Sequence, residues 1–188
     1  MGQLLGKARL REAAEPLVNL DGTSVYVLWE SFNDVAEGFG INVEELTEII
    51  SALQNSVFAH APKQVILVTV ERMFEALDTD KNMLIDSLEA LVTLCMLSGI
   101  ELREKAKFCF MCYDFDESGQ ITMDEMTLLL KSCATGLCKL SQETQVPEEA
   151  KLEQLAQDAF KRTGSTDDIR ITAEEFIDYC CSTPEIID

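Results

Sequence analysis

The feature that most constrains the fold is a short pattern that occurs four times in 188 residues. Each copy has an apolar stretch with helical spacing, a polar loop containing an isoleucine, and a glutamate four residues after that isoleucine. Unequal distances between the copies exclude a regular solenoid but suit helix-loop-helix units joined by linkers of different length. The four pairs are Ile41/Glu45, Ile85/Glu89, Ile121/Glu125 and Ile171/Glu175.

The loop of the third unit carries an oxygen donor at every position that a twelve-residue calcium-binding loop requires. A hard cation takes about six to eight oxygen ligands, so the chain must wrap around it. Gly119, at the sixth position, permits the positive φ that this turn demands. The sequence therefore predicts a Ca²⁺ site here, with Mg²⁺ as an alternative occupant at rest. Its candidate ligands are Asp114, Asp116, Ser118, Gln120 (through its carbonyl), Thr122 and Glu125.

The loop of the second unit has the same donor spacing but lacks the glycine. Met83 stands at the sixth position, and a side chain held at positive φ costs about 1–2 kcal/mol, or about tenfold in affinity. A fourth carboxylate, Asp86, acts in the opposite direction. Two interpretations stay open, a second Ca²⁺ site and a loop kept only as a structural partner. The candidate ligands are Asp78, Asp80, Asn82, Leu84 (through its carbonyl), Asp86 and Glu89.

The loops of the first and fourth units, residues 34–45 and 164–175, have lost their donor sets. Ala36 occupies a ligand position in the first loop, and Gly164 occupies the first ligand position in the fourth. Neither loop can complete a coordination shell. Both keep the isoleucine, which predicts that each still pairs by a short β-bridge with a neighbouring loop.

These patterns predict an all-α protein of four helix-loop-helix units, paired into two lobes with short β-bridges between paired loops. We expect an N-terminal segment over residues 1–22, lobes over 23–100 and 101–182, and a tail over 183–188. Gly136 predicts the end of the helix that follows the third loop, because glycine often terminates helices.

Charge and composition exclude several classes of function. Lys and Arg number 15 against 34 Asp and Glu, which gives a net charge of −19. Such a chain would be repelled by phosphate groups, so we expect no nucleic-acid partner. A hydrophobic content of 47% excludes a disordered acidic tail. No arrangement of nucleophile, base and orienting group is visible, and we expect no enzyme activity.

The seven cysteines favour a reducing compartment, because their number is odd and no signal peptide is visible. We therefore expect a cytoplasmic protein, with membrane or cytoskeleton association as an open alternative. Cys109 and Cys112 form a C-x-x-C pattern, which zinc or redox sites also use. Their place within a helical stretch favours core packing instead.

The stretch from Trp29 to Tyr179 resembles the EF-hand superfamily and, within it, the neuronal calcium sensor (recoverin-like) and calcineurin B group. The degenerate first loop, the usable second and third loops and the Met1-Gly2 start carry this resemblance. It implies N-myristoylation of Gly2, although Gly6 replaces the preferred Ser or Thr. A membrane partner is expected only if Gly2 is acylated. The alternative is an amphipathic N-terminal segment packed on protein.

The resemblance also implies a calcium-binding regulatory sensor that exposes an apolar groove to bind an amphipathic target helix. The acidic surface predicts that this helix is basic. An alternative is a constitutive light chain or structural subunit of a cytoskeletal, axonemal or motor assembly. A simple calcium buffer is a third interpretation. The candidate groove residues, which could equally be core, are Met73, Phe74, Met96, Phe110, Met111 and Met126.

Overall fold

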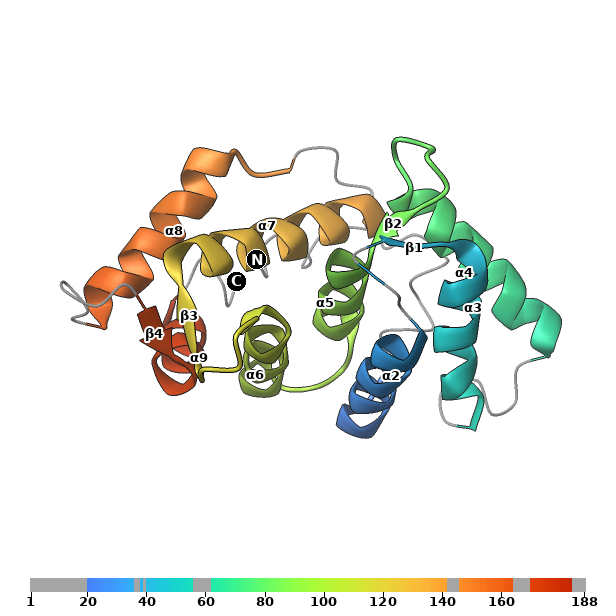
Figure 1. The fold of residues 1–188 in the computed structure, drawn as a ribbon, viewed down its shortest axis with the longest axis horizontal. Helices are drawn as coiled ribbons and strands as arrows, with labels where there is room; N and C mark the ends of the chain where they lie inside the picture. Colours follow the sequence, from blue (N-terminus) through green and yellow to red (C-terminus); the bar gives the residue numbers. More distant parts are fainter. Residues whose placement is uncertain are drawn as a thin grey trace.

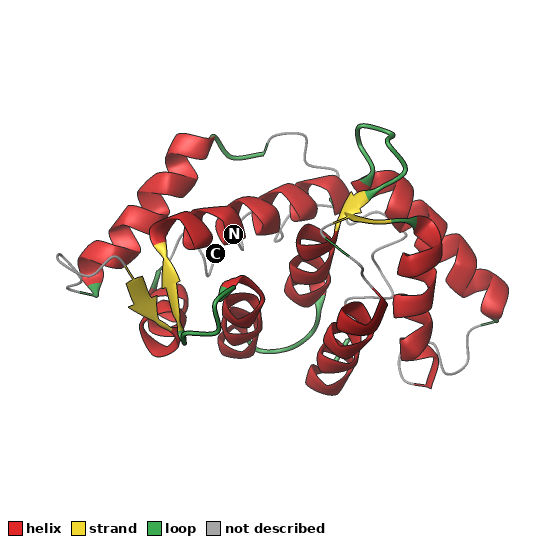
Figure 2. Ribbon diagram, viewed as in Figure 1, coloured by secondary structure: helices red, strands yellow, loops and turns green. Residues whose placement is uncertain are grey.

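The computed structural model describes residues 20–35, 38, 40–55, 62–141, 146–163 and 170–183. Helices make up most of the described chain (Figures 1 and 2). The α-helices are α2 (Gly22–Val35), α3 (Val43–Ser51), α4 (Lys63–Leu77), α5 (Ser87–Leu97), α6 (Leu102–Tyr113), α7 (Met123–Leu140), α8 (Glu149–Arg162) and α9 (Ala173–Ser182). A 3-10 helix, η2 (Ala52–Asn55), follows α3.

Two small antiparallel sheets join the loops in pairs, as the sequence predicts. Strand β1 (Gly40–Ile41) pairs with β2 (Ile85–Asp86), so that Ile41 lies opposite Ile85. Strand β3 (Gln120–Thr122) pairs with β4 (Arg170–Thr172), so that Ile121 lies opposite Ile171. All four isoleucines are buried. The predicted all-α fold of four helix-loop-helix units in two pairs is therefore confirmed.

The glutamate of the repeat has a structural role in three of the four units. In each, the glutamate side chain accepts a hydrogen bond from the backbone N–H of the helix-capping residue, whose own side chain accepts from the glutamate N–H. This reciprocal capping box satisfies donors that a helix start leaves free. The capping pairs are Asn42/Glu45, Thr122/Glu125 and Thr172/Glu175. Helix capping explains why Glu45 and Glu175 are present in loops that lack a donor set.

Helix α7 does not end at Gly136, so this prediction is wrong. The helix continues to Leu140. Gly136 is needed there for close packing, because a Cβ added to it would fall on the hydroxyl of Thr93 in α5 and 2.9 Å from the Thr93 Cβ. Helix α7 extends from β3 toward the β1–β2 pair and packs on α5 (Figure 1).

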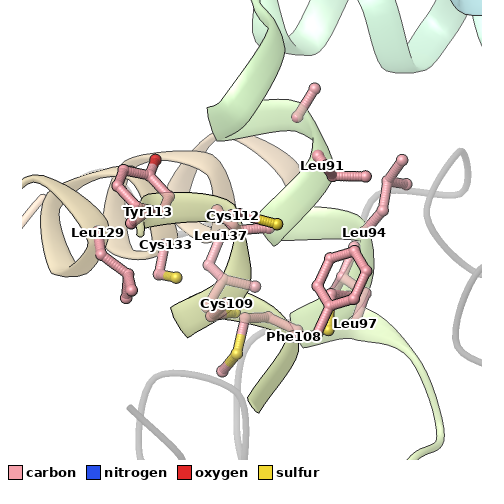
Figure 3. Close-up of a cluster of buried hydrophobic side chains, with 14 of the residues drawn as sticks. Leu91, Leu94, Leu97, Phe108, Cys109, Cys112, Tyr113, Leu129, Cys133 and Leu137 are labelled. Carbon is pink, nitrogen blue, oxygen red and sulfur yellow. The ribbon is translucent and has the colours of Figure 1, made fainter. Parts of the chain in front are cut away.

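The main hydrophobic core includes a cluster at which α5, α6 and α7 meet (Figure 3). Side chains from all three helices point into this cluster, among them Leu94, Phe108 and Leu137. Cys109 and Cys112 are both buried in it. Core packing, rather than a zinc or redox site, is therefore the role that the structure gives to the C-x-x-C pattern.

Thiol reactivity should follow burial. Six of the seven cysteines are buried, and only Cys181 is partly exposed. Burial raises the pKa of Cys180 to about 12, and it also raises the pKa of Cys112. Because the thiolate is the reactive form, we expect one thiol per chain to react rapidly with Ellman's reagent at pH 8 and all seven to react in denaturant. Two or more fast thiols in the native protein would contradict this packing.

No described helix has the combined length and apolar character that crossing a bilayer requires. The predicted acylation site, Gly2, lies outside the described residues. Myristoylation therefore stays a prediction.

Candidate metal centre

The third loop begins at the last turn of α6 and folds around the carboxylate of Asp114. Asp114 Oδ1 accepts a hydrogen bond from Ser118 N (3.0 Å), and Asp114 Oδ2 accepts one from Gly119 N (2.8 Å). Gly119 has φ +75°, the left-handed backbone expected from its position in the sequence. Asp116 Oδ1 also accepts from Ser118 N, at 3.2 Å. These contacts place the first, third and fifth positions of the loop side by side.

The second loop repeats this geometry position by position. Asp78 Oδ1 accepts from Asn82 N (3.1 Å), Asp78 Oδ2 accepts from Met83 N (3.1 Å), and Asp80 Oδ1 accepts from Asn82 N (3.3 Å). Met83 has φ +68°, as expected for the sixth position, and the residue is 66% exposed. The strain of a left-handed methionine is therefore present, but its side chain projects into solvent without a clash.

The final glutamates of the two loops have different partners. Glu125 Oε2 accepts hydrogen bonds from the backbone N–H (2.7 Å) and the hydroxyl (2.9 Å) of Thr122. Glu89 Oε1 instead lies 2.7 Å from Lys139 Nζ, at the far end of α7. Burial raises the pKa of Glu89, and the hydrogen bond and charge of Lys139 oppose that rise. Both glutamates thus have protein partners in place of a metal ion.

The Glu89–Lys139 ion pair should contribute to stability in a pH-dependent way. The two side chains are only 11% and 20% exposed, so Lys139→Met leaves a largely buried carboxylate without its partner. We expect a loss of about 1–3 kcal/mol in the free energy of unfolding at pH 7.5, the cost of a buried acceptor left without its donor. The loss should be smaller at pH 4.5. Burial raises the pKa of Glu89, so its charged form destabilises the folded state and stability falls as pH rises through that pKa. At pH 4.5 a larger fraction of Glu89 is neutral and needs no ion-pair partner.

Urea unfolding at both pH values measures this effect. Lys131→Met is the control, because Lys131 lies in the same helix and its ion pair with Glu149 is exposed. A second variant, Glu89→Gln combined with Lys139→Met, should recover part of the lost stability. Equal losses at both pH values would show that the charge of Glu89 is not involved.

Arg170 is a basic residue whose contact with the third loop was not predicted. Its Nη1 lies 2.7 Å from Asp116 Oδ2 and 2.8 Å from Ser118 Oγ. The hydrogen bonds from Ser118 and Arg170 lower the pKa of Asp116 to about 2. Asp116 therefore stays ionised over the whole physiological range.

The predicted ligands fit a hard cation in kind but do not form a compact carboxylate cluster. In each loop, carboxylate, amide or hydroxyl, and carbonyl oxygens share one short turn, and this is the donor set that Ca²⁺ prefers. Within the described residues, no three Asp, Glu, Cys or His side chains converge in a geometry that could hold a metal ion. The carboxylates of these two loops bind protein donors instead.

The two degenerate loops keep their pairing partners. The first retains Ile41 in its bridge and Asn42 as a helix cap. Of the fourth, residues 164–169 lie outside the described chain, while 170–175 form the bridge and the cap.

Five of the six predicted groove residues are buried, whereas Met111 is 37% exposed. The buried residues are Met73, Phe74, Met96, Phe110 and Met126.

Sequence reasoning missed both basic partners for different reasons. Arg170 could have been found, because pairing Ile121 with Ile171 places Arg170 opposite Thr122 in the third loop. Lys139 lies 50 residues from Glu89, and no local pattern connects the two. Only the path of α7 beyond Gly136 brings them together.

Paired helix-loop-helix units, two twelve-residue oxygen-rich loops and a bridge between paired loops are the architecture of the EF-hand fold. No family model matches the chain. Several relatives are recoverin-like neuronal calcium sensors, and the chain resembles this group at modest identity. It is 25% identical to a recoverin family protein of Dictyostelium discoideum, over 89% of this chain and 79% of the relative.

Two further relatives show the same resemblance. The chain is 28% identical to guanylyl cyclase-activating protein 2 of Lithobates pipiens, over 73% of this chain and 77% of the relative. It is 23% identical to recoverin of Homo sapiens, over 62% of this chain and 58% of the relative. The resemblance therefore rests on several proteins of one group at modest identity.

Proposed function

We propose that the protein is a calcium-binding regulator, with its principal site in the third loop. The observation that carries this proposal is the shared geometry of the two donor-rich loops. In each, one aspartate accepts from two successive backbone N–H groups, and the second of these belongs to a residue at positive φ. The proposed ligands of the principal site are Asp114, Asp116, Ser118, Gln120, Thr122 and Glu125.

The second loop is the proposed secondary site, with Asp78, Asp80, Asn82, Leu84, Asp86 and Glu89 as its ligands. Ca²⁺ is favoured because every proposed ligand atom is oxygen. The bound ion would supply a divalent positive charge to a strongly acidic loop. The residues of the chain supply the turn, the carboxylates and the pairing with a neighbouring loop.

Regulation of a protein target, rather than catalysis, is the activity that this arrangement favours. One relative is a guanylyl cyclase-activating protein, which by its name acts on another protein. The net charge of −19 favours a target helix that is amphipathic and basic. We propose a cytoplasmic location, in keeping with the buried free thiols.

The single tryptophan offers a direct test of calcium sensing. Trp29 in α2 packs edge-to-face on Phe108 in α6, with ring centroids 6.2 Å apart, and so joins the two halves of the chain. If calcium reorients the helices, Trp29 emission and the binding of an apolar dye should both change in a calcium titration. Magnesium at the same ionic strength is the control.

The same titration separates the sensor from a constitutive light chain. A light chain would bind calcium, if at all, without a change in Trp29 emission or in dye binding. If isothermal titration calorimetry detects calcium binding but both optical signals stay constant, the regulatory part of the proposal fails. If it detects no binding at micromolar to millimolar calcium, the metal site itself is wrong.

A further inference from the structure

The fourth unit contributes a positive charge to the third loop. Arg170 Nη1 donates hydrogen bonds to Asp116 Oδ2 and to Ser118 Oγ, which belong to the third and fifth positions of that loop. The Ser118 hydroxyl in turn donates to the carbonyl of Gln120, at the seventh position, over 3.0 Å. One guanidinium is therefore linked to three of the proposed ligand atoms.

The β-bridge fixes this contact in place. Arg170 lies directly opposite Thr122 in the β3–β4 pair, one residue before the Ile121–Ile171 contact. The three-residue strands allow little freedom in register, because a slip by one residue would move the buried isoleucines to the opposite face. The backbone of β4 thus holds the Arg170 side chain at the mouth of the third loop.

We propose that Arg170 is an affinity-determining residue of the third loop, a tethered cation that competes with a divalent metal for the oxygens of Asp116 and Ser118. This inference rests on the proposed function, because it concerns the metal site assigned there. It gives the degenerate fourth unit a role beyond β-pairing. The fourth unit lowers the calcium affinity of its neighbour.

Competition follows from charge and from the number of free lone pairs. A guanidinium and a divalent ion beside one carboxylate repel each other, and both require lone pairs of Asp116 Oδ2. The Ser118 oxygen already accepts from Arg170 at 2.8 Å, so its remaining capacity for a metal is small. A metal in this loop must therefore weaken or break the contacts that Arg170 makes.

The test measures calcium affinity by competition with a chromophoric chelator and by isothermal titration calorimetry. Arg170→Gln should raise the affinity of the third loop by about fivefold, the range of one partly exposed charge-assisted contact. Arg170→Lys keeps the charge but loses the planar guanidinium geometry, and should give an intermediate affinity. Far-UV circular dichroism confirms that each variant is folded.

Lys131→Gln is the matched control, because it also removes one positive charge from the same half of the chain but pairs with Glu149 rather than with a loop residue. A smaller increase in Lys131→Gln than in Arg170→Gln supports the proposal. Equal increases would mean that only net charge matters, and a decrease in Arg170→Gln would mean that Arg170 assists binding; either result overturns it. Absence of calcium binding in the wild type would instead refute the proposed function.

Discussion

Glu125→Gln should weaken calcium binding at the third loop by about 100-fold or more, because it removes a close charged partner of the ion, a loss of about 3 kcal/mol or more. Glutamine can still accept the hydrogen bond from Thr122, since capping boxes use either residue at this position. The free energy of unfolding should therefore stay within about 0.5 kcal/mol of the wild-type value. Calcium titration with calorimetric detection gives both the affinity and the stoichiometry.

Glu175→Gln is a closely matched control for this variant. Glu175 forms the same capping box with Thr172 at the start of α9, but the loop before it lacks a donor set. We expect Glu175→Gln to leave the calcium affinity of the third loop unchanged. Equal losses in the two variants would show that capping, rather than coordination, controls binding. Wild-type binding by Glu125→Gln would remove the third loop as the principal site.

Gly136→Ala should destabilise the fold by about 2–3 kcal/mol, even though alanine is the better helix former by about 1 kcal/mol. The new methyl group would collide with the hydroxyl of Thr93 and lie 2.9 Å from its Cβ, so α5 and α7 must separate. For a chain of this size the melting temperature should fall by about 4–12 °C. Urea and thermal unfolding, followed by far-UV circular dichroism, measure both quantities.

Gly22→Ala provides the comparison for this effect. A Cβ added there would make ordinary contact with Ile100 Cγ2 at 4.0 Å, so stability should change by less than about 0.5 kcal/mol. Thr93→Ala added to Gly136→Ala should restore part of the loss by removing the hydroxyl. If Gly136→Ala is as stable as the wild type, the close approach of α5 and α7 is wrong.

The fold could be predicted largely because each unit repeats the same local rules. The isoleucines predicted both β-bridges, because an isoleucine repeated at the same position of every loop indicates that the loops pair with one another there. The positive φ at Met83 and Gly119 followed from their position in the loop. The spacing within each twelve-residue loop was sufficient to identify its bridge isoleucine and its left-handed residue, even though the bridged isoleucines belong to different loops.

The prediction failed where a distant neighbour decides the structure. Gly136 predicted the end of a helix, but contact with Thr93 on another helix gives the glycine a packing role instead. The capping roles of Glu45 and Glu175 were also missed, although each lies close in sequence to its capping partner, Asn42 or Thr172. The ion pair between Glu89 and Lys139 depends on the course of α7, and no short sequence window contains that information.

Helix α7 connects the two proposed metal sites, because its first turn carries a ligand of one and its last turn contacts a ligand of the other. Glu125 lies in its first turn, and Lys139, the partner of Glu89, lies in its last turn. The two residues are separated by about 21 Å along a rigid rod, at 1.5 Å per residue. A tilt of only about 5° at the first end would shift the other by about 2 Å, enough to break a hydrogen bond. A tilt of α7 caused by a change in the third loop can therefore alter the Lys139–Glu89 contact at the second loop.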